Sequence, residues 1–188
     1  LHLLHSLNYN TKDSTQSDMA YPTTLLDYGE LSGGLVRMME RFRTEGNLTK
    51  DPDADRFLME DANAALLGML YDQRVLAEYA FTGPIRLKER LGHLDMKRLS
   101  ETSLDDLRVL FAVKPAVHRF TNVMADRTHQ IASILVEEYD GDAANMWNDG
   151  SDFSVIQKRL IALPGFGKMK ANKMKYVLHY FGHRDFSE

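Results

Sequence analysis

A short glycine-containing turn followed by lysines is the part of this sequence best suited to chemistry. Residues 163–167 read Leu-Pro-Gly-Phe-Gly, and two glycines in three positions leave main-chain N–H groups uncovered. We expect a helix to start directly after the turn, so that its positive dipole end points to the same place. Gly165, Phe166 and Gly167 therefore predict a cradle for an anion such as phosphate.

The charge around this turn is one-sided. From Phe153 to Arg184 the chain has seven Lys or Arg residues and no Asp or Glu, although its formal net charge is −4. A solvated helix face usually mixes both signs, and this one does not. The predicted partner is nucleic-acid phosphate, with Lys168, Lys170 and Lys173 neutralising the backbone.

Composition limits the remaining classes of function. The 188 residues are 44% hydrophobic and 27% charged, as in globular proteins. The absence of cysteine excludes disulfides, thiolate zinc sites and iron–sulfur clusters. No apolar run is long enough to cross a bilayer, so we expect a cytoplasmic protein without membrane contact. Residues 8–20 are rich in Asn, Thr, Ser, Asp and Gln, and residues 1–20 are expected to form a flexible tail.

The elements that must position the turn are all predicted to be helices. Apolar residues recur at helical spacing along nearly the whole chain, which predicts an all-α fold of about eight or nine short helices. Asp61 and Ser103 are expected N-caps, Asp51-Pro52-Asp53 a break, and Ser154 the start of a capping box. The expected helices span residues 31–45, 62–80, 84–91, 103–111 and 124–139, with one more on each side of the turn.

The histidines offer weaker signals. His179 and His183 are four residues apart on the last helix, a spacing that can clamp zinc. No carboxylate motif accompanies them, so a phosphate contact or a surface role is favoured and no metal site is predicted. His118 and Arg119 follow Pro115 and either contact DNA or cap a helix.

Three segments resemble the HhH-GPD superfamily of base-excision DNA glycosylases, which includes endonuclease III and the adenine glycosylases. Residues 163–172 look like the helix–hairpin–helix of that family. Residues 65–73 resemble its early helix, which ends in a Gln beside the active-site mouth. Residues 114–120 resemble a segment of an uncharacterised, mainly actinobacterial branch. Together the resemblance covers residues 48–182.

The resemblance implies a two-lobed, all-α fold without an iron–sulfur cluster. One lobe would comprise residues 62–150, and the other would combine residues 21–61 with the hairpin segment 151–188. The family binds one strand of double-stranded DNA through the hairpin N–H groups, often with a monovalent cation, and flips a base into a cleft. Gln73 matches the side chain that fills the resulting hole. Tyr71 and Tyr79 are either core residues or stack on the flipped base.

The resemblance also implies a reaction. Bifunctional members attack with a lysine two residues beyond the second hairpin glycine, and Met169 occupies that position here. A monomeric, monofunctional glycosylase that hydrolyses the N-glycosidic bond of a damaged or modified base is therefore expected. Asp185 lies near the place of the family's catalytic Asp, and Asp72, beside Gln73, is the second candidate. Asp72 is otherwise an exposed carboxylate on a helix, and Asp185 is otherwise a residue of a frayed C-terminus.

Two other functions remain open from the sequence. The first is a catalytically inactive DNA-binding or lesion-sensing protein on the same fold, because the usual catalytic Asp has no clear match. The second is a helical interaction protein whose basic face meets an acidic partner. Steep loss of duplex binding with rising salt would distinguish the DNA-binding functions from the last one.

Overall fold

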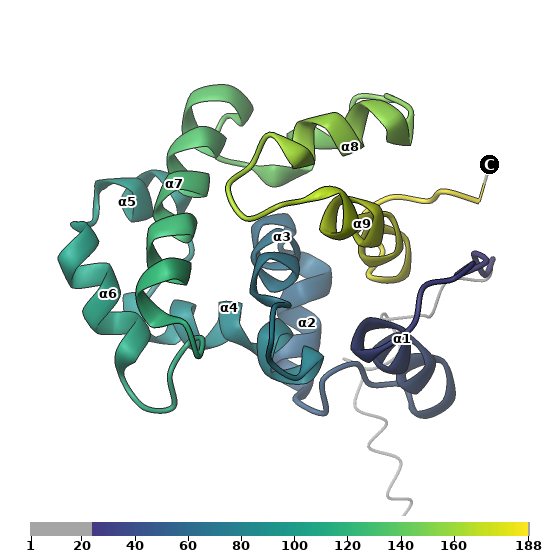
Figure 1. Ribbon diagram of the computed structural model, residues 1–188, viewed down its shortest axis with the longest axis horizontal. Coiled ribbons are helices and arrows are strands. Elements are labelled where there is room, and N and C mark those ends of the chain that lie inside the picture. The colour runs from purple at the N-terminus through teal and green to yellow at the C-terminus, as the bar shows by residue number, and fades with distance from the viewer. Residues whose placement is uncertain (1–23, 188) are drawn as a thin grey trace, which may run out of the picture.

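The computed structural model describes residues 24–187, and within that range every regular element is a helix and there is no strand (Figure 1). The all-α prediction is confirmed for this part of the chain, whereas the expected tail at residues 1–20 lies outside the described residues. The helices are α1 (Gly34–Glu45), α2 (Pro52–Glu60), α3 (Ala62–Tyr71), α4 (Ala77–Leu91), α5 (Met96–Glu101), α6 (Leu104–Ala112), α7 (Thr121–Tyr139), the 3-10 helix η1 (Ala143–Met146), α8 (Phe153–Ile161) and α9 (Lys168–Tyr180).

Helix α3 is the centre of the fold. Every residue from 64 to 71 is buried, so this helix is apolar on all sides rather than on one face. It packs against α2, α4 and α9 (Figure 1). The buried end of α3 therefore fixes the position of the residues that follow Tyr71.

The helix expected over residues 62–80 is in fact two helices. Its predicted start is right, since the Asp61 side chain accepts the N–H of Ala64 at 2.9 Å. However, α3 ends at Tyr71 and α4 begins only at Ala77. Leu76 continues the apolar spacing but is 70% exposed, because it lies in the connection rather than on a buried face. The connection 72–76 turns the chain beside the end of α3.

Several predicted helix ends are confirmed. Gly46 and Gly92 end α1 and α4 in the left-handed conformation, which glycine adopts at little cost. The Ser103 side chain caps α6 by accepting the N–H of Asp106.

Three other predicted ends are wrong. The predicted break at Asp51-Pro52-Asp53 ends at Asp51, the N-cap of α2, and Pro52 and Asp53 already belong to the helix, because Pro is well tolerated at a first helical position. Pro84 lies inside α4 rather than opening a helix. The N-cap of α8 is Asp152, so Ser154 is an interior residue.

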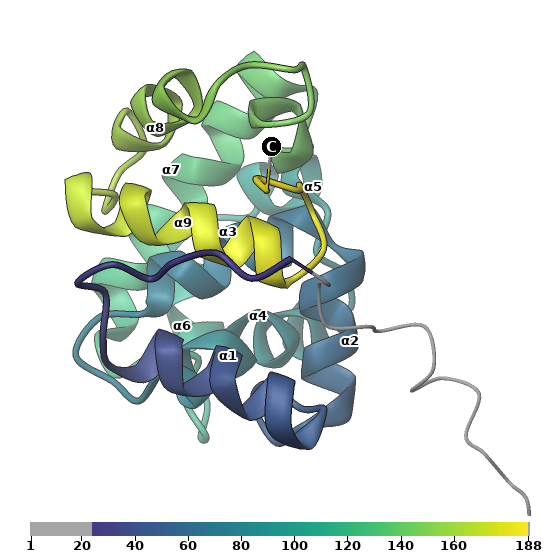
Figure 2. The same ribbon diagram turned by 90° about the vertical axis from the view of Figure 1, so that its right-hand side faces the viewer.

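The described N-terminal segment runs alongside α9 (Figure 2). The Tyr180 hydroxyl bonds to both the N–H and the carbonyl of Leu26, and the Tyr176 hydroxyl donates to the Asp27 carbonyl at 3.0 Å. Helix α1 packs on α4, which belongs to the expected central lobe. One continuous apolar core extends from α1 to α9.

Candidate nucleic-acid interface

Two residues of the turn between α8 and α9 pack into the protein interior and fix the position of the turn. Gly165 has φ +80°, and a Cβ there would lie 2.7 Å from Cδ1 of Leu70 at the end of α3. Glycine is thus required both by the left-handed backbone and by close packing. Phe166 is only 4% exposed and joins the core. These two predicted DNA-binding residues fix the position of the turn and do not present side chains to a ligand.

Gly167 is different, because nothing in the fold requires a glycine there. It is the N-cap of α9 with φ −87°, which any residue can adopt, and nothing lies within 4 Å of a Cβ built on it. No side chain caps this helix. The N–H groups of its first turn, which have no partner within a helix, are therefore open at the surface. This is the geometry that binds an anion at a helix N-terminus.

The three predicted phosphate-binding lysines have different environments. Lys168 is exposed next to the open N-terminus of α9, and Lys173, more than one helical turn further along α9, is half-buried. Lys170 points inward: its Nζ donates to the Leu70 carbonyl at 2.6 Å and to Oε1 of Gln73 at 3.3 Å. Burial, and then the charge of Arg127, lower the pKa of Lys170 to about 8. Lys170 therefore ties α9 to the end of α3.

Two hydrogen bonds hold the Gln73 side chain near the turn between α8 and α9. Its Oε1 accepts from Lys170 and, at 3.2 Å, from Nη1 of Arg127 on α7. The Arg127 side chain also lies beside Gly165, where a Cβ would come within 2.9 Å of Cδ. Arg127 is not recognisable from the sequence, because an arginine in the middle of a long helix usually faces solvent. Arg127 therefore connects the hairpin to Gln73.

Asp72 is the carboxylate nearest to this arrangement. It follows α3 directly and is half-buried, and its N–H donates to the Met69 carbonyl at 3.2 Å. Burial raises the pKa of Asp72, while the charges of Lys173 and Lys170 act in the opposite direction. Among residues 24–187, its carboxylate has neither a hydrogen-bond donor nor an ion-pair partner. A partly desolvated carboxylate without a structural partner is typical of a functional site.

Asp185 lies elsewhere. It follows the last turn of α9, its side chain is 70% exposed, and its Oδ1 is 3.5 Å from Nδ1 of His179. The hairpin is at the opposite end of α9, about 20 Å away at 1.5 Å per residue over thirteen residues. The structure brings Asp72, Gln73, Lys170 and Lys173 together and leaves Asp185 outside.

The two tyrosines expected to stack on a base are both engaged in the fold. Tyr71 is fully buried, and its hydroxyl shares a hydrogen bond of 2.9 Å with that of Thr128. The Tyr79 hydroxyl donates to the Ala116 carbonyl, and the guanidinium of Arg86 lies 3.8 Å from the Tyr79 ring centroid. Tyr71 is therefore a core residue here, and Tyr79 has one ring face covered.

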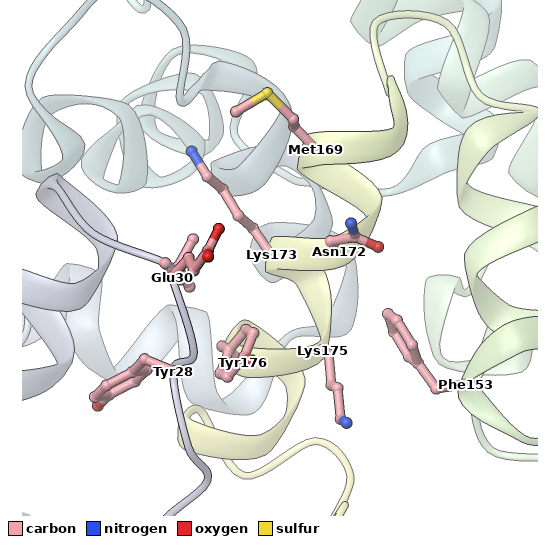
Figure 3. A pocket seen from close by; sticks show the side chains of 9 residues that line it. Tyr28, Glu30, Phe153, Met169, Asn172, Lys173, Lys175 and Tyr176 are labelled. Atoms are coloured by element: carbon pink, nitrogen blue, oxygen red, sulfur yellow. The ribbon is translucent and has the colours of Figure 1, made fainter.

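An open cavity lies instead on the outward side of α9. It has a volume of about 530 Å³ and extends between the N-terminal segment and α8 (Figure 3). Met169 and Lys173 line its end nearest the hairpin, with Glu30 facing them from the N-terminal segment. Met169 is 74% exposed. Tyr28 and Tyr176 line the same cavity and provide aromatic surface.

The predicted histidine roles are resolved by their partners. His118 is buried; its Nδ1 accepts the N–H of Phe120 and its Nε2 therefore donates to the Tyr71 carbonyl at 2.9 Å. Burial lowers the pKa of His118, which keeps the ring neutral. His179 and His183 bond to different carbonyls, those of Thr24 and Leu58. They do not form a clamp, and no metal-binding group of three or more His, Cys, Asp or Glu occurs within residues 24–187.

The hairpin itself contains no carboxylate, so a monovalent cation would find only main-chain carbonyls there, and that of Leu163 already accepts the N–H of Phe166.

None of the helices in residues 24–187 has the length and apolar character needed to span a membrane. Neither the known protein-family models nor the curated proteins include a match to this chain.

Proposed function

We propose that this protein is a DNA-binding, monofunctional base-excision glycosylase with the two-lobed HhH-GPD fold. One observation carries the proposal: the uncapped N-terminus of α9 lies beside Asp72, a half-buried carboxylate without a partner in the described chain. The N–H groups that begin at Gly167 would hold one phosphate of a duplex, and Lys168 would neutralise its charge. The phosphate would then place the neighbouring nucleotide at Asp72.

Asp72 would supply the chemistry. In its ionised form the carboxylate stabilises positive charge that develops on the deoxyribose as the N-glycosidic bond breaks. A water molecule then bonds to C1′ and passes its proton to Asp72, while the bond electrons leave with the base. Met169 at the family's lysine position supports hydrolysis by water rather than attack by an amine.

The cavity beside α9 would receive the flipped base. Met169 and Lys173 line the end of the cavity nearest the hairpin, and the charge of Lys173 acts on Asp72. Tyr28 and Tyr176, whose ring centroids lie 5.8 Å apart, line this cavity and would contact the base there, in place of the expected role of Tyr71.

Single-turnover assays test this function. The wild type is incubated in excess with duplexes that each contain one modified base, and hot alkali then cleaves the abasic product. We expect product from at least one duplex, and its loss in Asp72→Asn but not in Asp185→Asn. Product that survives Asp72→Asn and disappears in Asp185→Asn would contradict the assignment of Asp72.

A lesion-sensing protein without catalysis is the second candidate. It is favoured by the position of Asp185, which matches the family's catalytic Asp most closely in sequence but lies at the far end of α9. The same assay separates the two functions, because a sensor binds the modified duplex more tightly than the unmodified one and releases no base.

A further inference from the structure

The cavity beside α9 contains two opposite charges that do not pair with each other. Lys173 lines the end nearest the hairpin, and Glu30 faces it from the N-terminal segment (Figure 3). Among residues 24–187, neither side chain forms a hydrogen bond or an ion pair. A carboxylate only accepts hydrogen bonds, and an ammonium only donates them. The cavity therefore presents an acceptor and a donor at the same end, and both are available to a ligand.

A tight turn fixes the backbone that carries Glu30. The N–H of Leu31 donates to the Tyr28 carbonyl at 2.9 Å, so Gly29 and Glu30 are the two central residues of this turn. Gly29 has φ +58°, and glycine is favoured where the first central residue of a turn is left-handed. Its N–H also donates to Oδ1 of Asp27 at 2.8 Å. The backbone of Glu30 is therefore held in place while its side chain is exposed toward the cavity.

Lys173 joins this cavity to the proposed catalytic carboxylate. Among the charges that act on Asp72, that of Lys173 has the largest effect on its pKa, and the same side chain lines the cavity. A base that bonds to Lys173 is therefore near Asp72. The cavity volume of about 530 Å³ lies within the range of roughly 300–1,000 Å³ that is usual for small-ligand pockets.

The four bases differ in the order of donors and acceptors on their Watson–Crick edges. Guanine presents two adjacent donors, N1–H and N2–H, next to the acceptor O6. Adenine and cytosine place a ring-nitrogen acceptor beside their amino group, and thymine places one N–H between two carbonyls. A carboxylate can therefore accept two adjacent donors only from guanine, and a neighbouring ammonium then donates to O6.

We propose that Glu30 selects a base with the Watson–Crick edge of guanine, by accepting its N1–H and N2–H while Lys173 donates to O6. The inference rests on the proposed function, because a base must leave the duplex before the cavity can read its edge. The substrate class is therefore a guanine modified on its five-membered ring, which keeps both donors. Glu30 lies outside residues 48–182, so the family resemblance assigns it no role.

Free nucleosides test the cavity without a duplex. Amide resonances of the ¹⁵N-labelled protein are followed during titration with deoxyguanosine or with deoxyinosine, which lacks the N2 amino group. We expect deoxyguanosine to shift the residues that line the cavity and to bind about tenfold more tightly, because deoxyinosine loses one hydrogen bond to a charged group. Glu30→Gln should abolish this preference, whereas Glu137→Gln, at an exposed residue of α7, should preserve it. Equal affinities for the two nucleosides, or no shifts among the lining residues, would overturn the role of Glu30.

Two duplexes that differ in the edge of the modified base separate this inference from the proposed function. One contains 8-oxoguanine and the other 8-oxoadenine, which carry the same oxygen at C8. In single-turnover assays we expect the wild type to release 8-oxoguanine at least about tenfold faster. Glu30→Gln should slow this release by about tenfold and bind undamaged duplex within about twofold of the wild type, because the hairpin contacts are unchanged.

The outcomes of the duplex assay distinguish the two claims. Equal release of both bases, faster release of 8-oxoadenine, or release only of bases without the edge of guanine would overturn selection by Glu30 and leave excision intact. If no modified duplex releases a base, excision itself is overturned, and the nucleoside titration then decides whether Glu30 reads the edge of guanine.

Discussion

Replacing Gly167 by aspartate should affect folding and DNA binding in opposite directions. Gly167 has an unstrained backbone, open space at its Cβ and an uncapped helix behind it. An aspartate there can accept a first-turn N–H, which stabilises a helix by only a few tenths of a kcal/mol (about 0.3 kcal/mol) relative to glycine. Its charge at the positive dipole end adds roughly 0.3–1 kcal/mol. We therefore expect Tm to rise by about 2–4 °C, since about 1 kcal/mol shifts a protein of this size by that amount.

The same carboxylate occupies the N–H groups that would hold phosphate. Losing one charge-assisted hydrogen bond to phosphate costs about 1.5–3 kcal/mol, so duplex binding should weaken by about 10- to 150-fold. Fluorescence anisotropy with a labelled duplex measures the affinity, and Val109→Asp on α6 controls for the added charge alone. Gly167→Asp protein that is as stable as the wild type and binds equally well would refute phosphate binding at α9.

Three further predictions concern the lysines and Asp72. Lys168→Gln should weaken binding to all duplexes and reduce the slope of log K against log salt by about one, as measured by anisotropy at several salt concentrations. Asp72→Asn should lower single-turnover excision by at least about 100-fold. It should also raise Tm at neutral pH. The pKa of Asp72 is raised in the folded protein, so the wild type loses stability relative to the variant as the pH rises through this raised pKa. The pKa of Lys170 is lowered to about 8 in the folded protein, so between pH 8 and pH 10.5 the unfolded state binds more protons than the folded state. The wild type should therefore gain stability relative to Lys170→Met as the pH rises across that range, as measured by unfolding in urea.

The helices were predictable where their ends depend on local chemistry. Glycines that end α1 and α4 and the Ser103 cap of α6 act within one turn of the chain, so the sequence alone indicates them. The break at residues 72–76 was not predictable, because Leu76 continues the apolar spacing of α3. Its exposure is decided by the packing of α3 and α4, which no local pattern encodes.

The candidate site was predictable only in part. The glycines and lysines of the hairpin are close in sequence, so an open helix N-terminus could be expected from their order alone. The inward direction of Lys170 depends on the carbonyl of Leu70, one hundred residues earlier. The burial of Tyr71 follows from neighbours on all sides of α3, and the distance of Asp185 from the hairpin follows from the length of α9.

The most direct test of the central claim is to observe the hairpin N–H groups while DNA binds. Backbone amide resonances of the ¹⁵N-labelled protein are followed as a short duplex is added at low salt. Binding of phosphate at α9 predicts that the largest shifts belong to Gly167, Lys168 and Met169, with smaller shifts in residues 72–76 and little change in α6. Shifts concentrated outside α9 and residues 72–76, or no shifts at all, would contradict the claim that this helix N-terminus holds DNA.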